Sequence, residues 1–291
     1  ASFLQSAGNM VVPSILNALM CVLDVILNAI FIPKYGVLGA GLGTCLAVVI
    51  ICFVEFWFCC FRYEPLRLNR KESCSFDGSV LRRALKIGAP VGVESMALSG
   101  AQVVSTTIIA PLGAVSIAAH SLSITAESLC FMPGYGISTA AMTLVGQSVG
   151  AKDYTLARRY GYITVAFGSA VMAFTGILMY IFCPYVFRML TPVKEVQDVA
   201  VRILRIGLIA EPLYGVAMVS SGALRGAADT LVPSILNLFS MWVVRLGLAF
   251  TLVPLYGIYG MWTAMAIELC VRGILMFTRL VRSKHMRYDL V

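Results

Sequence analysis

The side chains of Asp24 and Asn28 lie four residues apart in an otherwise apolar stretch. If that stretch is helical, they stand one turn apart on one face, so a carboxylate and an amide oxygen can approach the same ion. Hard cations such as Na⁺ are bound by oxygen atoms of this kind, and a carboxylate can instead carry a proton. The spacing predicts a cation or proton site, with a hydrogen bond between helices as the structural alternative.

Acidic side chains recur inside the long apolar segments, where each costs free energy unless it faces a partner or a water-filled cavity. The acids are Asp24, Glu55, Glu94, Glu127, Glu211 and Glu268, and the bases well inside are Arg245 and Arg272. Glu268 and Arg272 stand at i and i+4, which predicts a structural ion pair. Glu55 lies near a segment end and is expected to reach the aqueous boundary. The remaining acids outnumber the remaining base, which favours a pathway for cations or protons.

Two of these acids stand beside prolines. Glu94 lies four residues after Pro90, and Glu211 directly precedes a proline. Proline removes a backbone hydrogen bond and loosens a helix next to the charge. We therefore expect Glu94 and Glu211 to take part in cation or proton coupling. Glu127 and His120 could do the same, or they could only tie helices together.

Enzyme signatures are absent from the sequence, which has only two histidines and no HExxH, GxSxG or CxxC pattern. The segment GQSVGAK at 146–152 lacks the spacing of a phosphate-binding loop. We therefore expect no enzyme, no cofactor, and no metal other than Na⁺ at Asp24 and Asn28.

The composition indicates a membrane protein, because 59% of the residues are hydrophobic and 12% are charged. Soluble domains average about 45–50% apolar and about 25% charged residues. The net charge of +8 would suggest a nucleic-acid partner in a soluble protein, but here the basic residues fall in short segments between long apolar runs. We interpret them as topology signals and expect a lipid bilayer, and no nucleic acid, as the partner.

Eight apolar stretches are long enough to cross about 30 Å of hydrocarbon as helices. They lie at about 10–32, 37–61, 87–110, 114–149, 160–183, 199–223, 230–253 and 257–278. Runs of this length lack the alternation of barrel strands, so the expected fold class is all-α, an integral membrane bundle of about eight transmembrane helices. The fourth stretch contains Pro133 and Gly134, and we expect it to be bent or broken, either as a simple kink or as part of a gate.

Basic residues are divided unevenly between the two sides of the membrane. One set of alternate connections holds fifteen Lys and Arg residues, and the opposite set holds five. This asymmetry predicts that residue 1 and the C-terminus are cytoplasmic in a multi-pass protein of the plasma or bacterial inner membrane. The polar stretch 62–79 is then a cytoplasmic linker between two helices in 1–61 and a six-helix lobe in 80–282, and 283–291 is a cytoplasmic tail.

One helical hairpin is duplicated within the sequence. The segment VPSILN occurs at 12–17 and again at 232–237, an offset of 220. The match resumes after one inserted residue at an offset of 221, which pairs Gly36 with Gly257. An even number of helices separates the copies, so we expect a parallel repeat. The offset predicts that roughly 140 residues and four helices precede this chain in a parent of about twelve helices.

The two copies differ at polar positions. At an offset of 220, Asp24 faces Val244. Arg245 faces Val25. We therefore expect one half to couple an ion and the other to shape the substrate site.

Three segments carry a resemblance to a known family: GALRGAADT at 222–230, GAPVGVES at 88–95, and AAHSLSI followed by FMPGYGISTAAMTLVGQSVGA within 118–151. With them the chain resembles the multidrug and toxic compound extrusion (MATE) transporters over essentially its whole length, as the last eight of twelve helices. The resemblance implies a V-shaped pair of six-helix lobes, which exports cationic or amphiphilic drugs and metabolites in exchange for Na⁺ or H⁺.

The resemblance also implies particular site residues. The family's cation site in the N-terminal lobe corresponds to Asp24, Asn28 and Thr44, although acid and amide stand here in reversed order. The acids on the seventh and tenth helices of the family correspond to Glu94 and Glu211, each displaced by about one turn.

The substrate cavity is expected to be lined by Glu127, Tyr214 and Arg245, with Tyr214 in the place of the tenth-helix acid. The expected function is a secondary antiporter, and negative cavity walls would favour cationic substrates. A flippase for lipid-linked saccharides is the nearest alternative, but it would need several arginines at the cavity for pyrophosphate, and only Arg245 can be assigned there. The other alternative, a receptor or channel without coupled transport, is disfavoured by the repeat. The chain on its own is expected to be inactive.

Overall fold

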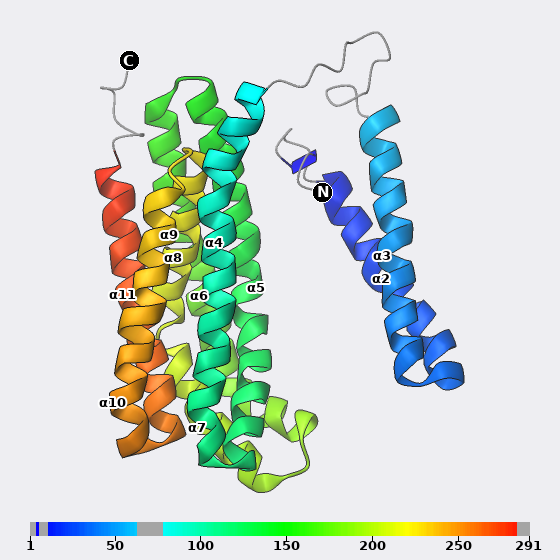
Figure 1. Ribbon diagram of the computed structural model, residues 1–291, viewed down its shortest axis with the longest axis vertical. Coiled ribbons are helices and arrows are strands. Elements are labelled where there is room, and N and C mark those ends of the chain that lie inside the picture. Colours follow the sequence, from blue (N-terminus) through cyan, green and yellow to red (C-terminus); the bar gives the residue numbers. More distant parts are fainter. Residues whose placement is uncertain (1–3, 6–10, 63–77, 284–291) are drawn as a thin grey trace. The chain divides into compact units, whose positions relative to one another are not determined.

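The structure is a computed structural model that describes residues 4–5, 11–62 and 78–283 (Figure 1). All regular structure in these ranges is helical, which confirms the all-α class. The chain divides into two compact units, residues 1–76 and 77–291, each with its own helices.

The first unit contains α2 (Val11–Tyr35) and α3 (Val37–Trp57), which continues into the π-helical turn η1 (Phe58–Arg62). The second unit contains α4 (Gly78–Ile109), η3 (Ala110–Leu112), α5 (Ala114–Gly150), α6 (Tyr154–Leu190), α7 (Lys194–Leu208), α8 (Glu211–Gly226), α9 (Leu231–Phe239), η4 (Ser240–Arg245), α10 (Leu246–Tyr256) and α11 (Ile258–Arg282).

Most of the expected membrane spans are present as long apolar helices. Six helical segments in the described ranges are long and apolar enough to cross a membrane: α2, α3 with η1, α4 with η3, α5, α6, and the continuous path from α9 to α10. The consecutive helices α7 and α8, bent by 55° at the break between them, make a seventh. The eighth expected span corresponds to α11, whose 25 residues include four charged ones and which is not among these candidates.

The duplicated hairpin folds in the same way in both copies. Gly36 joins α2 to α3 with φ 56°, and Gly257 joins α10 to α11 with φ 57°. Glycine adopts this left-handed backbone without strain. Three residues later, an added Cβ at Gly39 or Gly260 would collide with a backbone oxygen of the preceding helix. The repeated glycines therefore set the turn and the close packing of each hairpin.

The inserted residue of the second copy is absorbed by a π-helical turn. The first copy is an uninterrupted α-helix of 25 residues, whereas the second takes 26 residues and contains η4 between α9 and α10. A π-turn closes its hydrogen bond over one residue more than an α-turn. From the end of η4 onward the copies therefore pair at an offset of 221, which brings Arg245 opposite Asp24 and replaces its pairing with Val25.

The expected break in the fourth stretch is absent. Pro133 and Gly134 lie inside α5, which is helical without interruption over 37 residues. Neighbouring helices can satisfy backbone groups near such a proline. The hydroxyl of Thr175 in α6 donates to the carbonyl oxygen of Cys130, one turn before Pro133, at 3.2 Å.

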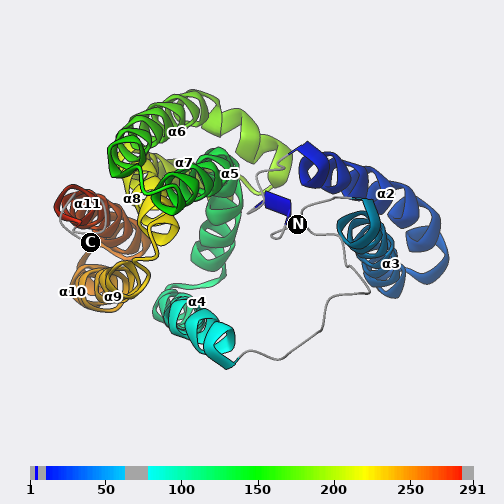
Figure 2. The same cartoon turned by 90° about the horizontal axis from the view of Figure 1, so that it is seen from above.

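The helix α8 lies at the centre of the second unit, packed against α5, α6 and α11 (Figure 2). Small residues permit this close approach. An added Cβ at Gly222 would collide with the backbone oxygen of Ser138 in α5, and one at Gly273 in α11 would collide with that of Leu213. Helices that associate in lipid commonly meet at small residues in this way. The helix α4 packs mainly against α9 and α10.

Candidate functional site

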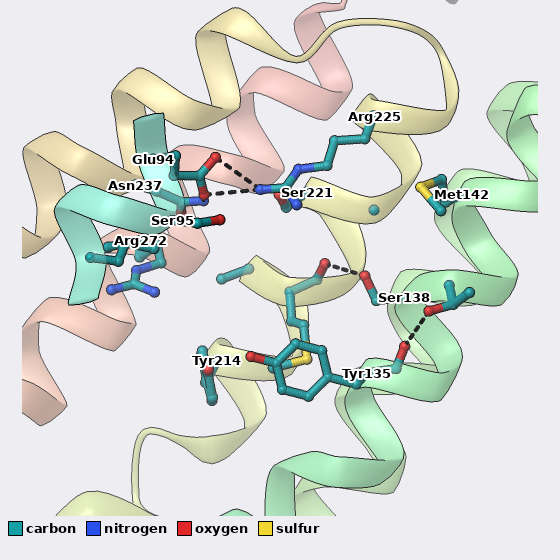
Figure 3. Close-up of a pocket in the computed structure, with 15 residues that line it drawn as sticks. Glu94, Ser95, Tyr135, Ser138, Met142, Tyr214, Ser221, Arg225, Asn237 and Arg272 are labelled. Atoms are coloured by element: carbon teal, nitrogen blue, oxygen red, sulfur yellow. Dashed lines mark hydrogen bonds and ion pairs between the residues drawn. The ribbon is translucent and has the colours of Figure 1, made fainter. Parts of the chain in front are cut away.

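The carboxylate of Glu94 is held by side chains from two other helices. Glu94, on α4, is 3% exposed. Arg225 of α8 donates to both of its oxygens at 2.9 Å (Figure 3). On α9, Asn237 donates to Oε1 at 2.6 Å and Ser234 donates to Oε2 at 2.5 Å. Glu94 is thus paired with a counter-charge and joins α4 to α8 and α9.

The partners of Glu94 were not recognised from the sequence. Arg225 is one of the fifteen basic residues on the expected cytoplasmic side, where a basic residue indicates topology. Ser234 and Asn237 belong to the repeated VPSILN segment, and repetition by itself indicates shared structure and not a site. A signal was available, because Arg225 lies in the LRG motif that carries part of the family resemblance.

Two adjoining cavities lie in the second unit. The Glu94 cavity, of about 370 Å³, is lined by Glu94, Ser138, Ser221 and Arg225, among others. The Glu127 cavity, of about 440 Å³, is lined by Gln102, Glu127, Phe131 and Arg245, among others. Both linings include Leu98, Tyr135, Tyr214 and Arg272. Figure 3 shows Tyr135, Tyr214 and Arg272 around the Glu94 cavity.

Arg245 and Arg272 share a single carboxylate. Arg272 donates through Nε to Oε1 of Glu268 at 2.7 Å, as the i, i+4 spacing predicted. Arg245, at the end of η4, donates to Oε2 of the same side chain through Nε at 3.1 Å and Nη2 at 2.9 Å. Glu268 is completely buried. Arg245 is therefore part of an ion-pair cluster and not an isolated base.

The two cavities carry more arginine than the sequence suggested. Only Arg245 was assigned to the substrate cavity, whereas Arg225 and Arg272 line the Glu94 cavity and Arg272 also lines the Glu127 cavity. The helix order alone could not show this, because Arg225 of α8 reaches Glu94 of α4 across the cavity that both residues line.

Glu211 begins α8, directly after the bend that separates α7 from α8, and it is fully buried. Within the described ranges, neither of its carboxylate oxygens has a hydrogen-bond partner. Its side chain lies beside Gly176 of α6, where an added Cβ would come within 3.2 Å of the Glu211 Cβ. A buried carboxylate without a donor or a counter-charge costs several kcal/mol while it is ionised.

Glu127 and His120, both on α5, have different surroundings. Glu127 is 5% exposed, lines its cavity, and lies near Gly207 at the end of α7. His120 accepts a hydrogen bond at Nδ1 from the indole of Trp262 at 3.2 Å. This bond ties α5 to α11, so the contacts of His120 agree with the structural interpretation.

The first unit brings two of its three expected residues into contact. Asn28 donates to Asp24 Oδ1 at 3.1 Å, one turn apart on α2. The Asn28 Oδ1 atom faces Gly43 of α3, where a Cβ would displace it, and has no hydrogen-bond partner among the described residues. Thr44 follows Gly43 on α3 and is exposed within this unit. The acid and the amide are thus in contact on one face of α2 through the amide nitrogen, while the amide oxygen faces α3.

Comparisons with known proteins give a family for this architecture. Residues 90–251 match the family model described as MatE. A Thermotoga maritima protein named "Probable multidrug resistance protein NorM" is 28% identical over 286 residues, covering 94% of this chain and 61% of that protein. The chain therefore spans about three fifths of the length of this curated relative.

Solved structures share the fold. A crystal structure of a variant of the Vibrio cholerae MATE transporter VcmN has a TM-score of 0.88 at 18% identity, covering 98% of this chain and 65% of that one. The MATE transporter ClbM in complex with Rb⁺ has a TM-score of 0.77 at 20% identity, covering 95% of this chain and 62% of that one.

Proposed function

Because this chain belongs to the MatE family, we propose that it forms part of a secondary antiporter, which exports organic drugs or metabolites, often cationic ones, in exchange for H⁺ or Na⁺. The protein is a multi-pass membrane protein, and we place it in the plasma or bacterial inner membrane with residue 1 and the C-terminus in the cytoplasm. In Figure 1 the start of α4 and the end of α11 lie at the same end of the second unit, in keeping with an even number of crossings.

The isolation of Glu211 supports proton exchange more than any other observation. Antiport needs a group that binds the coupling ion in one state and releases it in another. Glu211 is fully buried and has no hydrogen-bond partner within the described ranges. Taking up a proton removes the cost of an unpaired buried charge. We assign Glu211 as the proton-carrying group of the second unit.

Glu94 would take part by a different route. Its two bonds to Arg225 link α4 to α8. A proton on Glu94 would abolish the ion pair, so α4 would be freed from α8 when the carboxylate is neutralised. In this scheme Glu94 couples the ion to movement, and Arg225 is its partner.

Asp24, Asn28 and Thr44 form the proposed cation site of the first unit. The carboxylate of Asp24 and the free Oδ1 atom of Asn28 are oxygen ligands of the kind that a hard cation prefers. The Rb⁺ complex of ClbM shows that a protein of similar fold can hold a monovalent cation. The proposal for Asp24 and Asn28 rests on their contact.

The substrate would occupy the cavities of the second unit. Tyr214 lines both cavities, and its ring stacks edge-on against Phe131 with centroids 6.0 Å apart. Aromatic walls suit flat apolar compounds, and Glu127 would attract a cationic group. Arg245 lines the same cavity.

The test uses the full-length parent protein in proteoliposomes that contain a fluorescent organic cation. A pH gradient or an Na⁺ gradient is imposed, and export is followed for wild type, Glu211→Gln and Asp24→Asn. We expect Glu211→Gln to abolish export driven by the pH gradient, because the amide cannot carry the proton. Asp24→Asn should abolish any export driven by Na⁺.

Each outcome separates one part of the proposal. Unchanged pH-driven export by Glu211→Gln would remove Glu211 from the mechanism. If neither gradient drives export of any organic cation by the wild type, the antiport proposal itself fails. Chain 1–291 alone should export nothing, and gradient-driven export by it would contradict that expectation.

The flippase alternative gains one argument from the structure, since three arginines line the cavities. Two of their charges are balanced by Glu94 and Glu268, so one guanidinium charge remains for the two phosphates of a pyrophosphate. Antiport remains the better-supported function. Transfer of a lipid-linked saccharide across vesicles that contain the parent protein, in the absence of any gradient, would reverse this preference.

A further inference from the structure

The cluster of Arg245, Arg272 and Glu268 carries an unbalanced positive charge. Two guanidinium groups, which stay protonated in proteins, face one carboxylate. Each arginine binds a different oxygen of Glu268, so the carboxylate pairs with both arginines at the same time. The cluster by itself thus carries one net positive charge, and Glu127, which lines the same cavity as both arginines, is the acid that faces it.

The two arginines of this cluster line the Glu127 cavity. Glu268 is completely buried and does not line the cavity, whereas Arg245 and Arg272 both do. A guanidinium has five N–H donors in a planar fork. Each arginine binds Glu268 through Nε and Nη2. The two N–H groups of Nη1 and the second N–H of Nη2 therefore remain as donors for a ligand.

The π-helical turn is what brings the second arginine to this place. Arg245 is the last residue of η4, the turn that absorbs the residue inserted in the second copy of the hairpin. The equivalent position of the first copy, at an offset of 221, holds Asp24. The second copy thus differs from the first in both register and charge at the same point, and π-turns are frequent at functional sites.

Apart from Gln102 and Glu127, the rest of the lining is apolar or aromatic. Phe131, Met241 and Met265 contribute apolar surface to the Glu127 cavity, and Tyr135 and Tyr214 contribute rings. Its volume of about 440 Å³ lies in the range of small-molecule sites, about 300–1,000 Å³. Glu127 is the acidic residue in this lining, and its negative charge would weaken the binding of an anion by the two arginines.

We propose that the Glu127 cavity binds an anionic group, a carboxylate, sulfonate or phosphate, carried on an apolar or aromatic body, with Arg245 and Arg272 as its donors. This inference rests on the proposed export function, because it names a class of compound that the cavity would carry. It adds anionic amphiphiles to the cationic substrates expected from the acidic residues.

Equilibrium binding tests the site apart from transport. The full-length parent is placed in nanodiscs of zwitterionic lipid, and pyrenebutyrate is compared with its neutral amide, pyrenebutyramide, after subtraction of binding to empty nanodiscs. Losing a hydrogen bond to a charged group costs about 1.5–3 kcal/mol, so Arg245→Gln should weaken pyrenebutyrate binding about tenfold or more. Binding of the amide should be unchanged. Glu268 keeps Arg272 as a partner in this variant.

Two further variants test the direction and the specificity of the effect. Glu127→Gln removes the opposing acid and should strengthen pyrenebutyrate binding. Arg279→Gln changes net charge by the same amount as Arg245→Gln, but Arg279 pairs with Asp229 and does not line either cavity. It should leave the ratio of acid to amide binding unchanged.

The inference fails if the wild type binds pyrenebutyrate no more tightly than the amide, or if Arg245→Gln weakens both compounds equally. Nanodiscs that contain phosphatidylglycerol distinguish the source of the anion. Displacement of pyrenebutyrate by that lipid would assign the site to a lipid phosphate, and retention would assign it to an amphiphile from solution. Selective binding by a protein that shows no gradient-driven export would leave this site standing while the antiport proposal fails.

Discussion

The buried acids of the second unit differ in whether an arginine balances their charge. Glu94 and Glu268 are each held by arginine, and Asp229 accepts two hydrogen bonds from Arg279, at 2.9 and 2.6 Å. Neither carboxylate oxygen of Glu211 has a hydrogen-bond partner within the described ranges. Because an uncompensated charge is costly in a membrane, taking up a proton relieves Glu211 of that cost, which favours Glu211 for ion exchange.

Arg225 and Glu94 should be energetically coupled. In Arg225→Gln the carboxylate of Glu94 stays buried without its counter-charge, so the parent protein should lose thermal stability in detergent. The double variant with Glu94→Gln should lose less than the sum of the two single variants, by about 1–3 kcal/mol, as groups in direct contact do. The check is a thermal-unfolding cycle of the four proteins. Additive losses would show that the pair contributes nothing beyond its separate parts.

The two copies of the hairpin differ in one element, because only the second contains the π-helical turn η4. The first copy of the hairpin is regular α-helix, and the second contains six π-helical residues that end at Arg245. In a regular α-helix, one extra residue would rotate the following side chains by about 100° relative to those before it. The π-helical turn takes up that residue, so α10 continues in the register of the first copy, and Arg245 at the end of the turn reaches Glu268.

The glycines of α8 and α5 should differ sharply in their tolerance of alanine. A Cβ at Gly222 meets the backbone oxygen of Ser138, which cannot move without its helix, so Gly222→Ala should cost about 1–3 kcal/mol. A Cβ at Gly136 meets nothing within 4 Å, and Gly136→Ala should stabilise α5 by about 0.5–1 kcal/mol. Thermal midpoints of the two variants, measured side by side, decide this. Equal midpoints would mean that α5 and α8 do not meet as described.

At the scale of the whole molecule, two units with the same hairpin turn have different charges at equivalent positions. The first has Asp24 bonded to Asn28, and the second has Arg245 bonded to Glu268. A transporter built on parallel repeats can thus keep one scaffold while it places cation chemistry in one half and anion chemistry in the other. The proposed cation site at Asp24 and the proposed anion site at Arg245 agree with this division.

The orientation can be tested on the full-length protein by cysteine labelling. In a cysteine-free background, a single cysteine in place of Arg282, the exposed last residue of α11, should react with a membrane-impermeant maleimide only from the cytoplasmic side. One in place of Thr191, between α6 and α7, should react only from the opposite side, since α6 crosses the membrane once. Labelling of both positions from the same side would refute this topology.

The class of the protein follows from the sequence by itself. Hydrophobic content and the length of apolar runs predicted an all-α membrane protein, because a helix is the element that satisfies its own backbone in lipid. The repeated VPSILN segment and its paired glycines predicted the duplicated hairpin, because identical turn residues impose identical backbone. The i, i+4 spacing predicted the pair of Glu268 with Arg272, since such contacts lie within one helix.

The contacts between helices were decided only by the tertiary structure. No local pattern shows that Arg225 reaches Glu94, 131 residues away in the chain, or that Arg245 joins Arg272 on Glu268. Nor does composition show that Glu211 has no hydrogen-bond partner among the described residues. The charge of a site depends on which side chains packing brings together, and that is a property of the assembled helices and not of any single one.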